Sequence, residues 1–453
     1  MADSRPNVLW LMTDEQRTDS LGCYGSPWAA TPNLDRLARE GAIYRHAVTP
    51  APVCVPARLS LFTGQYPSRT GIWWNRHRHH LDLPHLTAPL IEAGYASASF
   101  GKQDFHTLRP AFALEEPHVL SDAVHYYHYA EQYDAAAHGV VQYPPEPYPW
   151  IFGGRYPEPA EHTAEAGVVR AAQGWLDALP ADRPFLLRLS FNGPHTPVVP
   201  PAPFDTAVAE EAIRLPAEAE DLPAGCPEWV GEWLARAASS SRLTPEQISA
   251  MRRYYYGEVA YLDSLLGGLL DWMRSRGLLE NTIVALASDH GTHLGDYGLV
   301  QKQTFYMPVV QVPLLFWYPS AVPAGRAFET PVESLSLLPT LLEVTGLPVP
   351  PCDGVSLAQS LTAGEEPDPR PVFSEFTLGS FDMRPDDRLV MVREGDWRLS
   401  CCLDPEPGDV DLCNLAQDPH ERCNLHGDPG TEGIEAHLLG LIQAHIEGAR
   451  RDV

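Results

Sequence analysis

Cys54 is the side chain in this sequence whose setting most clearly suggests covalent chemistry. It begins the string CVPAR at residues 54–58, and LFTG follows at residues 61–64. A thiol becomes a good nucleophile when it ionises, and a nearby cation promotes that ionisation. Arg58 comes one helical turn later, so it can hold residue 54 in place and add positive charge. The alternative interpretation is a buried structural cysteine in a proline-containing turn before a helix.

The string C-x-P-x-R with its Thr-Gly tail resembles the signature of the formylglycine-dependent sulfatases, which belong to the alkaline phosphatase superfamily. The same string is the recognition motif of the formylglycine-generating enzyme. The resemblance implies that Cys54 is oxidised to formylglycine (3-oxoalanine), whose aldehyde hydrates to a gem-diol. One hydroxyl attacks the sulfur of a sulfate ester, and the other expels sulfate as the aldehyde re-forms. The start of the following helix favours the bound anion.

The resemblance also implies a binding site for one divalent cation. Asp14 matches the first member of the family's acidic pair, and Glu15 stands where relatives commonly have Asp or Gln. Asp289 and His290, in SDHG at residues 288–291, match the family's Asp-Asn/His-Gly motif. With an oxygen of formylglycine at residue 54, these residues are the predicted ligands. Carboxylate oxygens suit calcium, whereas the imidazole nitrogen shifts the preference toward manganese, so we expect calcium slightly ahead of manganese.

Cationic residues complete the resemblance. Lys102 matches the family's Gly-Lys, and Lys302 matches the lysine that follows the second metal motif. His195 matches the histidine of Pro-His-x-Pro, whereas His106 lies four residues after Lys102 instead of the family's usual two. The resemblance implies that the lysines and the metal stabilise the charged sulfate oxygens in the transition state. A histidine protonates the leaving group, and we favour His195 over His106 for this role.

The resemblance extends over almost the whole chain. The residues from Asp411 to Leu425, with DPHERCNL at 418–425, resemble the family's closing motif, whose role is structural. The family resemblance implies an α/β fold of the alkaline phosphatase type. This is an α/β/α sandwich with a large mixed, mostly parallel sheet, followed by a small C-terminal α+β domain. We predict a catalytic domain over residues 1–365 and the small domain over residues 366–453.

The predicted function is hydrolysis of a small-molecule anionic sulfate ester, with the formylglycine-generating enzyme as a partner during maturation. A phosphonate monoester or phosphodiester hydrolase with the same nucleophile is the closest alternative, because both substrates present a singly charged centre. A binding protein with a decayed site is the alternative from another class. The sequence leaves the natural substrate open among aryl, sugar and choline-type sulfates, and it leaves the oligomeric state open.

Apolar runs and helical periods predict the elements that position these residues. Asn7–Thr13 is a nearly continuous apolar run, which is typical of a strand buried on both faces. Thr31 and Pro32 predict a helix start with Thr31 as its cap, and Thr244 with Gln247 predicts a capping box for a helix that ends near Arg276. Further predicted strands are Tyr95–Phe100, Pro184–Asn192, Thr282–Ser288, Pro313–Tyr318, Leu389–Arg393 and Trp397–Cys401, and Gly433–Ala449 is a predicted terminal helix. The stretch Tyr143–Pro159 is rich in Pro and Tyr and predicts an irregular loop or lid.

Composition narrows the class of protein. The 453 residues carry a net charge of −27 with a pI near 5.0, which argues against nucleic-acid binding and requires any anion site to be locally positive. No run of eighteen apolar residues is present, so we expect no membrane segment. The eight cysteines are irregularly spaced, and Met1–Met12 lacks the features of a signal peptide. We therefore expect a cytoplasmic protein without a disulfide framework.

Overall fold

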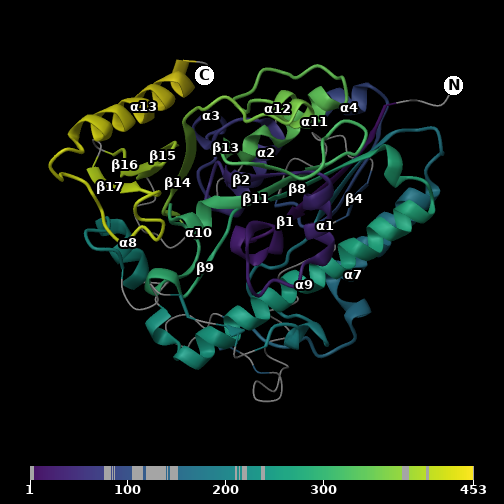
Figure 1. The fold of residues 1–453 in the computed structure, drawn as a ribbon, viewed down its shortest axis with the longest axis horizontal. Coiled ribbons are helices and arrows are strands. Elements are labelled where there is room, and N and C mark those ends of the chain that lie inside the picture. Colours follow the sequence, from purple (N-terminus) through teal and green to yellow (C-terminus); the bar gives the residue numbers. More distant parts are fainter. Residues whose placement is uncertain are drawn as a thin grey trace.

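The structure is a computed structural model of the chain. It describes residues 5–75, 83, 85, 87–104, 116–118, 139, 141–142, 151–209, 212–213, 215–216, 222–235, 240–379, 387–404 and 408–451. Within these residues, a large sheet lies between two layers of helices, and a smaller sheet with a long helix follows near the C-terminus (Figure 1). The predicted fold class is confirmed.

Nine strands of the described residues form the central sheet, in the order β12-β2-β11-β8-β1-β7-β3-β4, with β13 also paired to β2. The described pairings are parallel except those of β11, which runs antiparallel to both β2 and β8. The sheet is therefore mixed and mostly parallel. Its strands are β1 (Asn7–Thr13), β2 (Ala42–Val48), β3 (Ala96–Gly101), β4 (Glu116–His118), β7 (Phe185–Ser190), β8 (Thr282–Ser288), β11 (Gln311–Trp317), β12 (Arg326–Phe328) and β13 (Val332–Glu333).

Alternate residues of β1 enter the two cores of the sandwich. Leu9 and Leu11 pack in the core that includes α1 (Pro32–Glu40), α7 (Ala164–Ala178) and α9 (Pro245–Ser275). Val8, Trp10 and Met12 point to the opposite face. Their core includes α2 (Cys54–Thr63), α4 (Ala88–Glu92), α11 (Leu337–Val344) and α12 (Ala358–Ala363). A strand that is apolar at every position thus serves both layers, as its sequence predicts.

The predicted helix starts are found, with one difference in capping. Helix α9 has the predicted capping box, in which the Thr244 side chain accepts from Gln247 N and the Gln247 side chain accepts from Thr244 N. Helix α1 begins at Pro32 with Thr31 at the N-cap position, as predicted, but the Thr31 side chain makes no capping hydrogen bond. The Thr31 hydroxyl instead accepts from Gly22 N and donates to Asp35 Oδ1, so it ties the preceding turn to the helix.

A four-stranded antiparallel sheet and a long helix form the C-terminal part. The strands pair in the order β14-β15-β16-β17, and α13 packs against β15 and β16. The two predicted strands and the predicted helix here are confirmed, whereas β14 and β17 were not predicted. The boundary between residues 365 and 366 stays a prediction. The elements are β14 (Val372–Thr377), β15 (Arg388–Glu394), β16 (Trp397–Cys402), β17 (Gly408–Asn414) and α13 (Glu432–Arg451).

Short elements join these layers. They are α3 (Pro67–Thr70), α8 (Glu228–Trp233), α10 (Met307–Val310), β5 (Val141–Gln142), β6 (Ile151–Gly153), β9 (His293–Leu294) and β10 (Val300–Gln301). The predicted loop Tyr143–Pro159 is described only from residue 151, where β6 pairs with β5, and residues 154–159 are irregular as predicted. The eight cysteines, all within the described residues, form no disulfide.

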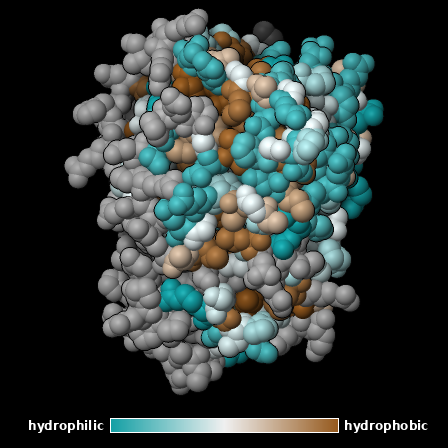
Figure 2. All heavy atoms as spheres, turned by 90° about the vertical axis from the view of Figure 1, so that its left-hand side faces the viewer, coloured by the Kyte–Doolittle hydropathy of each residue, from teal (hydrophilic) through white to brown (hydrophobic). Residues whose placement is uncertain are grey.

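The surface mixes polar and apolar side chains. On the face at the left of Figure 1, hydrophobic residues form smaller groups between larger hydrophilic areas (Figure 2). In the described part of the chain, no helix has both the length and the apolar character needed to cross a membrane.

Candidate active site

The predicted site residues lie at the carboxyl-terminal edge of the central sheet. Asp14 follows β1 directly, and Asp289 and His290 follow β8. Lys102 follows β3, and His195 lies in the loop after β7. Because β8, β1, β7 and β3 are adjacent and parallel, their carboxyl ends bring these side chains to one edge. Open α/β sheets place their binding sites at this edge.

Helix α2 presents the candidate nucleophile to this edge. Cys54 is the first residue of the helix, so its side chain lies at the end that carries positive partial charge. The Val55 N–H donates to Asn75 Oδ1 over 2.9 Å, which helps to fix the first turn. Every residue of α2 is buried, and Gly64 ends the helix in the left-handed conformation at φ 68°. The helix therefore holds residue 54 rigidly against the sheet.

Arg58 joins the two carboxylates predicted to bind the metal. Its buried guanidinium donates from Nε to Asp289 Oδ2 and from Nη2 to Asp14 Oδ2, each over 2.7 Å. Nη1 donates to Ser190 Oγ over 2.8 Å and to the backbone oxygen of Lys102 over 3.2 Å. A planar guanidinium can serve partners in several directions at once, so Arg58 sets the spacing between Asp14 and Asp289.

The sulfur atom of Cys54 lies among basic nitrogens. Lys302 Nζ is 2.9 Å from Sγ, His290 Nε2 is 3.3 Å away, and Lys102 Nζ is 3.8 Å away. Burial and the carboxylate of Asp14 raise the pKa of the thiol, but Lys102, Lys302 and His290 outweigh them. The pKa of Cys54 therefore lies well below its usual range. This position favours negative charge on whatever group occupies it.

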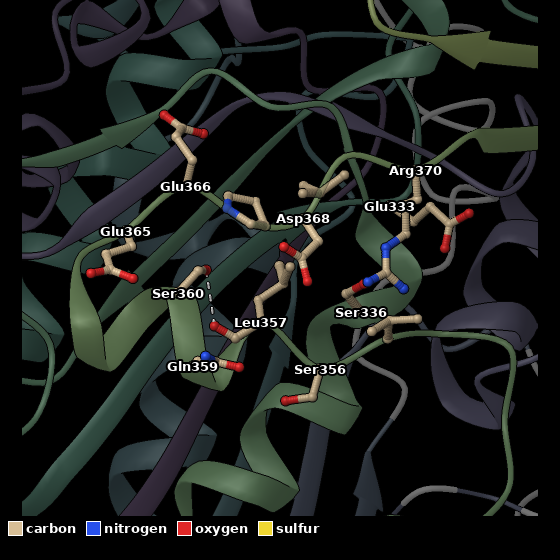
Figure 3. Close-up of a pocket in the computed structure, with 13 residues that line it drawn as sticks. Glu333, Ser336, Ser356, Leu357, Gln359, Ser360, Glu365, Glu366, Asp368 and Arg370 are labelled. Carbon is tan, nitrogen blue, oxygen red and sulfur yellow. Dashed lines mark hydrogen bonds between the residues drawn. The ribbon is translucent and has the colours of Figure 1, made fainter.

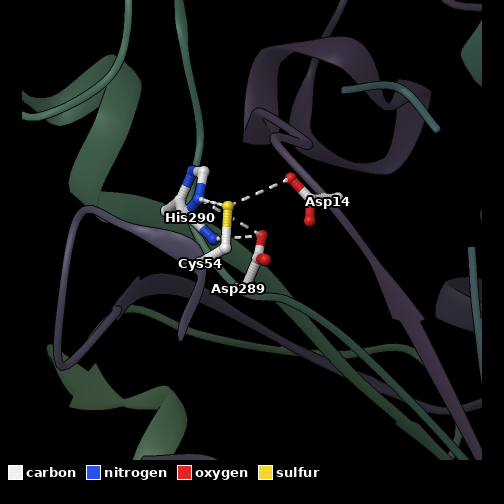
Figure 4. Close-up of side chains that lie close together, drawn as sticks. All are labelled: Asp14, Cys54, Asp289 and His290. Carbon is white, nitrogen blue, oxygen red and sulfur yellow. Dashed lines mark hydrogen bonds and ion pairs between the residues drawn. The ribbon is translucent and has the colours of Figure 1, made fainter. Parts of the chain in front are cut away.

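Four of the five predicted ligands form one compact group. The ligand atoms of Asp14, Cys54, Asp289 and His290, here called the metal-ligand group, lie within 4.8 Å of one another (Figure 4). His290 Nδ1 is 2.8 Å from the Gly291 carbonyl oxygen, which only accepts, so Nδ1 carries a proton and Nε2 is the nitrogen that faces the group. Burial raises the pKa of Asp289 to about 6 although Arg58 opposes it. This donor set fits a divalent cation, which would offset the buried negative charge.

Asp104 is a site residue that the sequence prediction missed. Its Oδ2 is 3.4 Å from Lys102 Nζ and 3.6 Å from Arg58 Nε, and Lys102 Nζ is also 2.6 Å from Asp14 Oδ2. Burial raises the pKa of Asp104, but Lys102 and Arg58 outweigh it and leave the pKa below its usual value. Asp104 stands two residues after Lys102, where the family usually has a histidine. This position, two residues after Lys102, was the sequence signal that could have identified Asp104 as a site residue.

Glu15, His195 and Lys302 form a second cluster beside Cys54. Glu15 Oε1 is 2.9 Å from Lys302 Nζ and 3.3 Å from His195 Nε2. His195 Nε2 is in turn 3.0 Å from Lys302 Nζ. Burial raises the pKa of Glu15, yet His195 and Lys302 outweigh it and lower the pKa below its usual value. Glu15, predicted as a fifth metal ligand, is thus directed toward the two residues predicted to act on the ester.

Lys302 reaches the site from a short irregular segment. It follows β10, and its neighbours Gln301 and Gln303 both have a φ of 72°, a conformation that side chains other than glycine seldom adopt. Trp233 Nε1 donates to the Lys302 carbonyl oxygen over 3.1 Å, and Gln303 N donates to Pro52 O over 3.3 Å. These bonds fix the backbone that carries the ammonium group to Cys54.

The structure leaves one predicted residue untested and adds another. His106 lies outside the described residues, so its role stays a prediction. Tyr255 on α9 was not predicted to contribute, but its hydroxyl donates to the Glu15 carbonyl oxygen over 2.6 Å and accepts from Arg17 N over 2.9 Å. A tyrosine at a helical core position gives no sequence signal for this contact.

A separate acidic pocket lies elsewhere on the molecule and shares no residue with this site (Figure 3). Glu333, Glu365 and Glu366 line it together with Arg370. Tyr66 donates a hydrogen bond from its hydroxyl to Glu333, and burial raises the pKa of Glu333 to about 8. A mostly acidic lining repels anionic esters, so the predicted chemistry belongs to the sheet edge.

Comparison with known families finds a match over most of the chain. The family model described as Sulfatase matches residues 6–347. The model described as N-sulphoglucosamine sulphohydrolase, C-terminal, matches residues 295–447. The first match contains the nine predicted site residues that the structure brings together, and the second covers the C-terminal sheet and most of its helix.

Individual relatives resemble the chain along its length. A choline-sulfatase of Rhizobium meliloti is 29% identical over 444 residues, which cover 95% of this chain and 84% of that protein. The solved phosphonate monoester hydrolase of Agrobacterium radiobacter has a TM-score of 0.82 at 23% identity, covering 99% of this chain and 96% of its own. The phosphonate monoester hydrolase of Silicibacter pomeroyi has a TM-score of 0.80 at 25% identity, with coverage of 99% and 96%.

Proposed function

Because this chain belongs to the sulfatase family, we propose that it hydrolyses a sulfate ester through a formylglycine made from Cys54, with one divalent metal ion beside it. Its class, sulfuric ester hydrolase, follows from the family and its named relatives. The observation that carries the finer proposal is the setting of Sγ. It lies at the N-terminus of α2, with Lys302 Nζ at 2.9 Å and Lys102 Nζ at 3.8 Å.

As formylglycine, residue 54 would supply a hydrated aldehyde, whose hydroxyl groups would serve as the nucleophile and for release of the sulfate. The chain's own residues prepare that position. Helix α2 and the two lysines favour negative charge there, and Arg58 fixes the adjacent carboxylates. Arg58 and Lys302 are buried and Lys102 is half-buried, so these cations act in a medium of lower dielectric constant, where a charge interaction is stronger than in water.

Asp14, Asp289, His290 and residue 54 would hold the metal, with calcium placed slightly ahead of manganese. The ion would supply Lewis acidity and positive charge beside the sulfate oxygens. Lys102 and Lys302 would bind sulfate oxygens, where negative charge grows as the ester bond breaks. His195 would donate a proton to the leaving alcohol, since it lies beside Lys302 and its side chain, 17% exposed, is the most accessible of the three residues in this cluster.

A phosphonate monoester or phosphodiester hydrolase is the second candidate function. The relative from Silicibacter pomeroyi, at 25% identity, favours it, and so does an imidazole among the predicted metal ligands. Both kinds of ester carry one negative charge at the reacting centre, so the same cations suit both. Hydrolysis of nitrophenyl sulfate and of a nitrophenyl phosphonate monoester, assayed side by side, would rank the two activities.

The first experiment is mass spectrometry of the tryptic fragment His46–Arg58, from protein produced with the formylglycine-generating enzyme. We expect the cysteine sulfur to be replaced by an aldehyde oxygen. A thiol that persists in the presence of that enzyme would contradict the proposed nucleophile. Aryl, sugar and choline sulfates are then compared as substrates, with protein produced without the generating enzyme as the control.

A further inference from the structure

Glu15 is the one predicted metal ligand whose carboxylate does not belong to the metal-ligand group. The atoms of that group lie within 4.8 Å of one another, and Glu15 is not among them. Glu15 belongs to a second group, with Asp14 and His195, whose ligand atoms also lie within 4.8 Å of one another and which shares Asp14 with the first. The ammonium group of Lys302 already supplies a cation there, 2.9 Å from Glu15 Oε1 and 3.0 Å from His195 Nε2. The side chain is fully buried, so its direction is not that of a mobile surface carboxylate. Its contacts therefore show which function it serves.

One oxygen of Glu15 binds two residues predicted to act on the ester. Oε1 is 2.9 Å from Lys302 Nζ and 3.3 Å from His195 Nε2. The other oxygen, Oε2, accepts from Thr196 N over 3.5 Å, in the loop that carries His195. The Lys302 ammonium group also lies 2.9 Å from Cys54 Sγ. Glu15 is thus the anion that brings the ammonium group and the imidazole together beside residue 54.

The backbone at Glu15 fixes this direction. Its φ of 60° is unusual for a residue with a side chain, and contacts on both sides hold it there. Its N–H donates to Asp289 Oδ1 over 3.2 Å, and its carbonyl oxygen accepts from the Tyr255 hydroxyl over 2.6 Å. From this fixed backbone, an aspartate would be one methylene too short to make the same contacts. The glutamate is therefore matched to the distance it spans.

We propose that Glu15 is a positioning residue for Lys302 and His195 and is not a metal ligand. This inference rests on the sulfatase function proposed above, in which Lys302 binds the sulfate group and His195 protonates the leaving group. Glu15 holds both through its carboxylate, while the metal-ligand group binds the cation without it.

Measuring metal affinity distinguishes a metal-ligand role of Glu15 from a positioning role, and it does not depend on catalytic activity. Calorimetric titration with Mn²⁺ and with Ca²⁺ is made on the parent protein, Glu15→Gln and the ligand control Asp289→Asn. We expect Glu15→Gln to keep the parent affinity to within about tenfold and Asp289→Asn to lose more than that, because it removes a charged ligand. A loss of tenfold or more in Glu15→Gln would overturn the proposal and make Glu15 a ligand.

Steady-state kinetics then tests positioning in the formylglycine form. Glu15→Asp keeps the negative charge but moves it away from Lys302 and His195, because the side chain is one methylene shorter. Glu15→Gln keeps the length of the side chain but removes its charge. We expect kcat to fall about 100-fold in both, with little change in KM and a larger fall for alkyl than for nitrophenyl sulfate. If both variants keep the kcat of the parent protein, the inference is overturned. A parent protein that binds metal but hydrolyses no sulfate ester would instead refute the proposed function.

Discussion

Replacing Arg58 with lysine tests whether a buried guanidinium, and not positive charge alone, holds the site together. Arg58 donates over 2.7 Å to both Asp14 and Asp289 and over 2.8 Å to Ser190. An ammonium group is a compact charge on a flexible stem and cannot reach both carboxylates from one position. Asp14 also has Lys102 Nζ at 2.6 Å, whereas Arg58 is the only Lys or Arg in a described ion pair with Asp289. An ammonium group directed at Asp14 therefore leaves Asp289 buried without its cation. Breaking a buried ion pair in this way costs about 3–5 kcal/mol.

That cost converts into a measurable change in thermal stability. The entropy of unfolding is about 2.1 cal/mol/K per residue, so 1 kcal/mol shifts the Tm of a 453-residue chain by about 1 °C. We expect Arg58→Lys to lower the Tm by about 3–5 °C in differential scanning calorimetry without added metal. Both proteins are produced without the formylglycine-generating enzyme. Arg58 lies in its recognition motif, and a difference in maturation would confuse the comparison.

Arg276→Lys is the matched control for this substitution. Arg276 Nε lies 2.9 Å from Asp177 Oδ1, but the two side chains are 40% and 53% exposed. An exposed pair of this kind contributes less than about 1 kcal/mol, so the Tm should move by no more than about 1 °C. If Arg58→Lys behaves like this control, the guanidinium geometry is not needed and the reasoning about Asp14 and Asp289 is refuted.

Three further predictions concern proton binding, the leaving group and the metal. Burial raises the pKa of Glu333 to about 8 from 4.5, so its stabilisation of the fold is complete below pH 4.5. That stabilisation is lost at about 1.4 kcal/mol per pH unit as the pH rises from 4.5 to 8, and the loss levels off above 8. Calorimetry of Glu333→Gln should show a smaller fall in Tm over this range, and an equal fall would contradict it. His195→Asn should lower kcat/KM by about 10²–10⁴-fold for an alkyl sulfate, whose leaving alcohol needs a proton, and by much less for nitrophenyl sulfate. Equal losses for the two esters would exclude His195 as the proton donor. Removal of the metal by a chelator should lower the Tm. Calcium or manganese at 100 times its Kd should then restore about 2.7 kcal/mol of the free energy of unfolding, and no recovery would argue against the metal site.

The elements next to the site were predictable because their sequences carry two signals at once. Asn7–Thr13 and Thr282–Ser288 are apolar at nearly every position, as strands covered on both faces must be, and a carboxylate follows each one directly. Strand β2 was missed because Arg45 and His46 interrupt its apolar run, and no site residue follows it directly. An apolar run reports burial on both faces, and β2 is half-exposed at these two positions.

The directions of the site side chains were not predictable, because they depend on contacts distant in sequence. Glu15 has a positive φ that is held by Tyr255, 240 residues away along the chain. Asp104 has a φ of 57° and takes the place beside Lys102 that the family's usual spacing reserves for a histidine. A motif indicates which residues approach the site. Which atom faces which partner is decided by backbone conformations that only the assembled fold imposes.

The charges gathered at the sheet edge bear on the proposal that a metal ion and a singly charged ester bind here together. Four carboxylates, those of Asp14, Glu15, Asp104 and Asp289, face three permanent cations, those of Arg58, Lys102 and Lys302. Their sum is −4 + 3 = −1, which repels an anion in a protein whose net charge is already −27.

A divalent ion changes that sum to +1, and a bound ester with one negative charge brings it to zero. Uncompensated charge is costly in a buried site, so this balance favours monoanionic esters over dianionic phosphate monoesters. Sulfate esters and phosphonate monoesters satisfy it equally. Charge therefore selects the class of reacting centre, and the choice between sulfur and phosphorus must come from the geometry around residue 54.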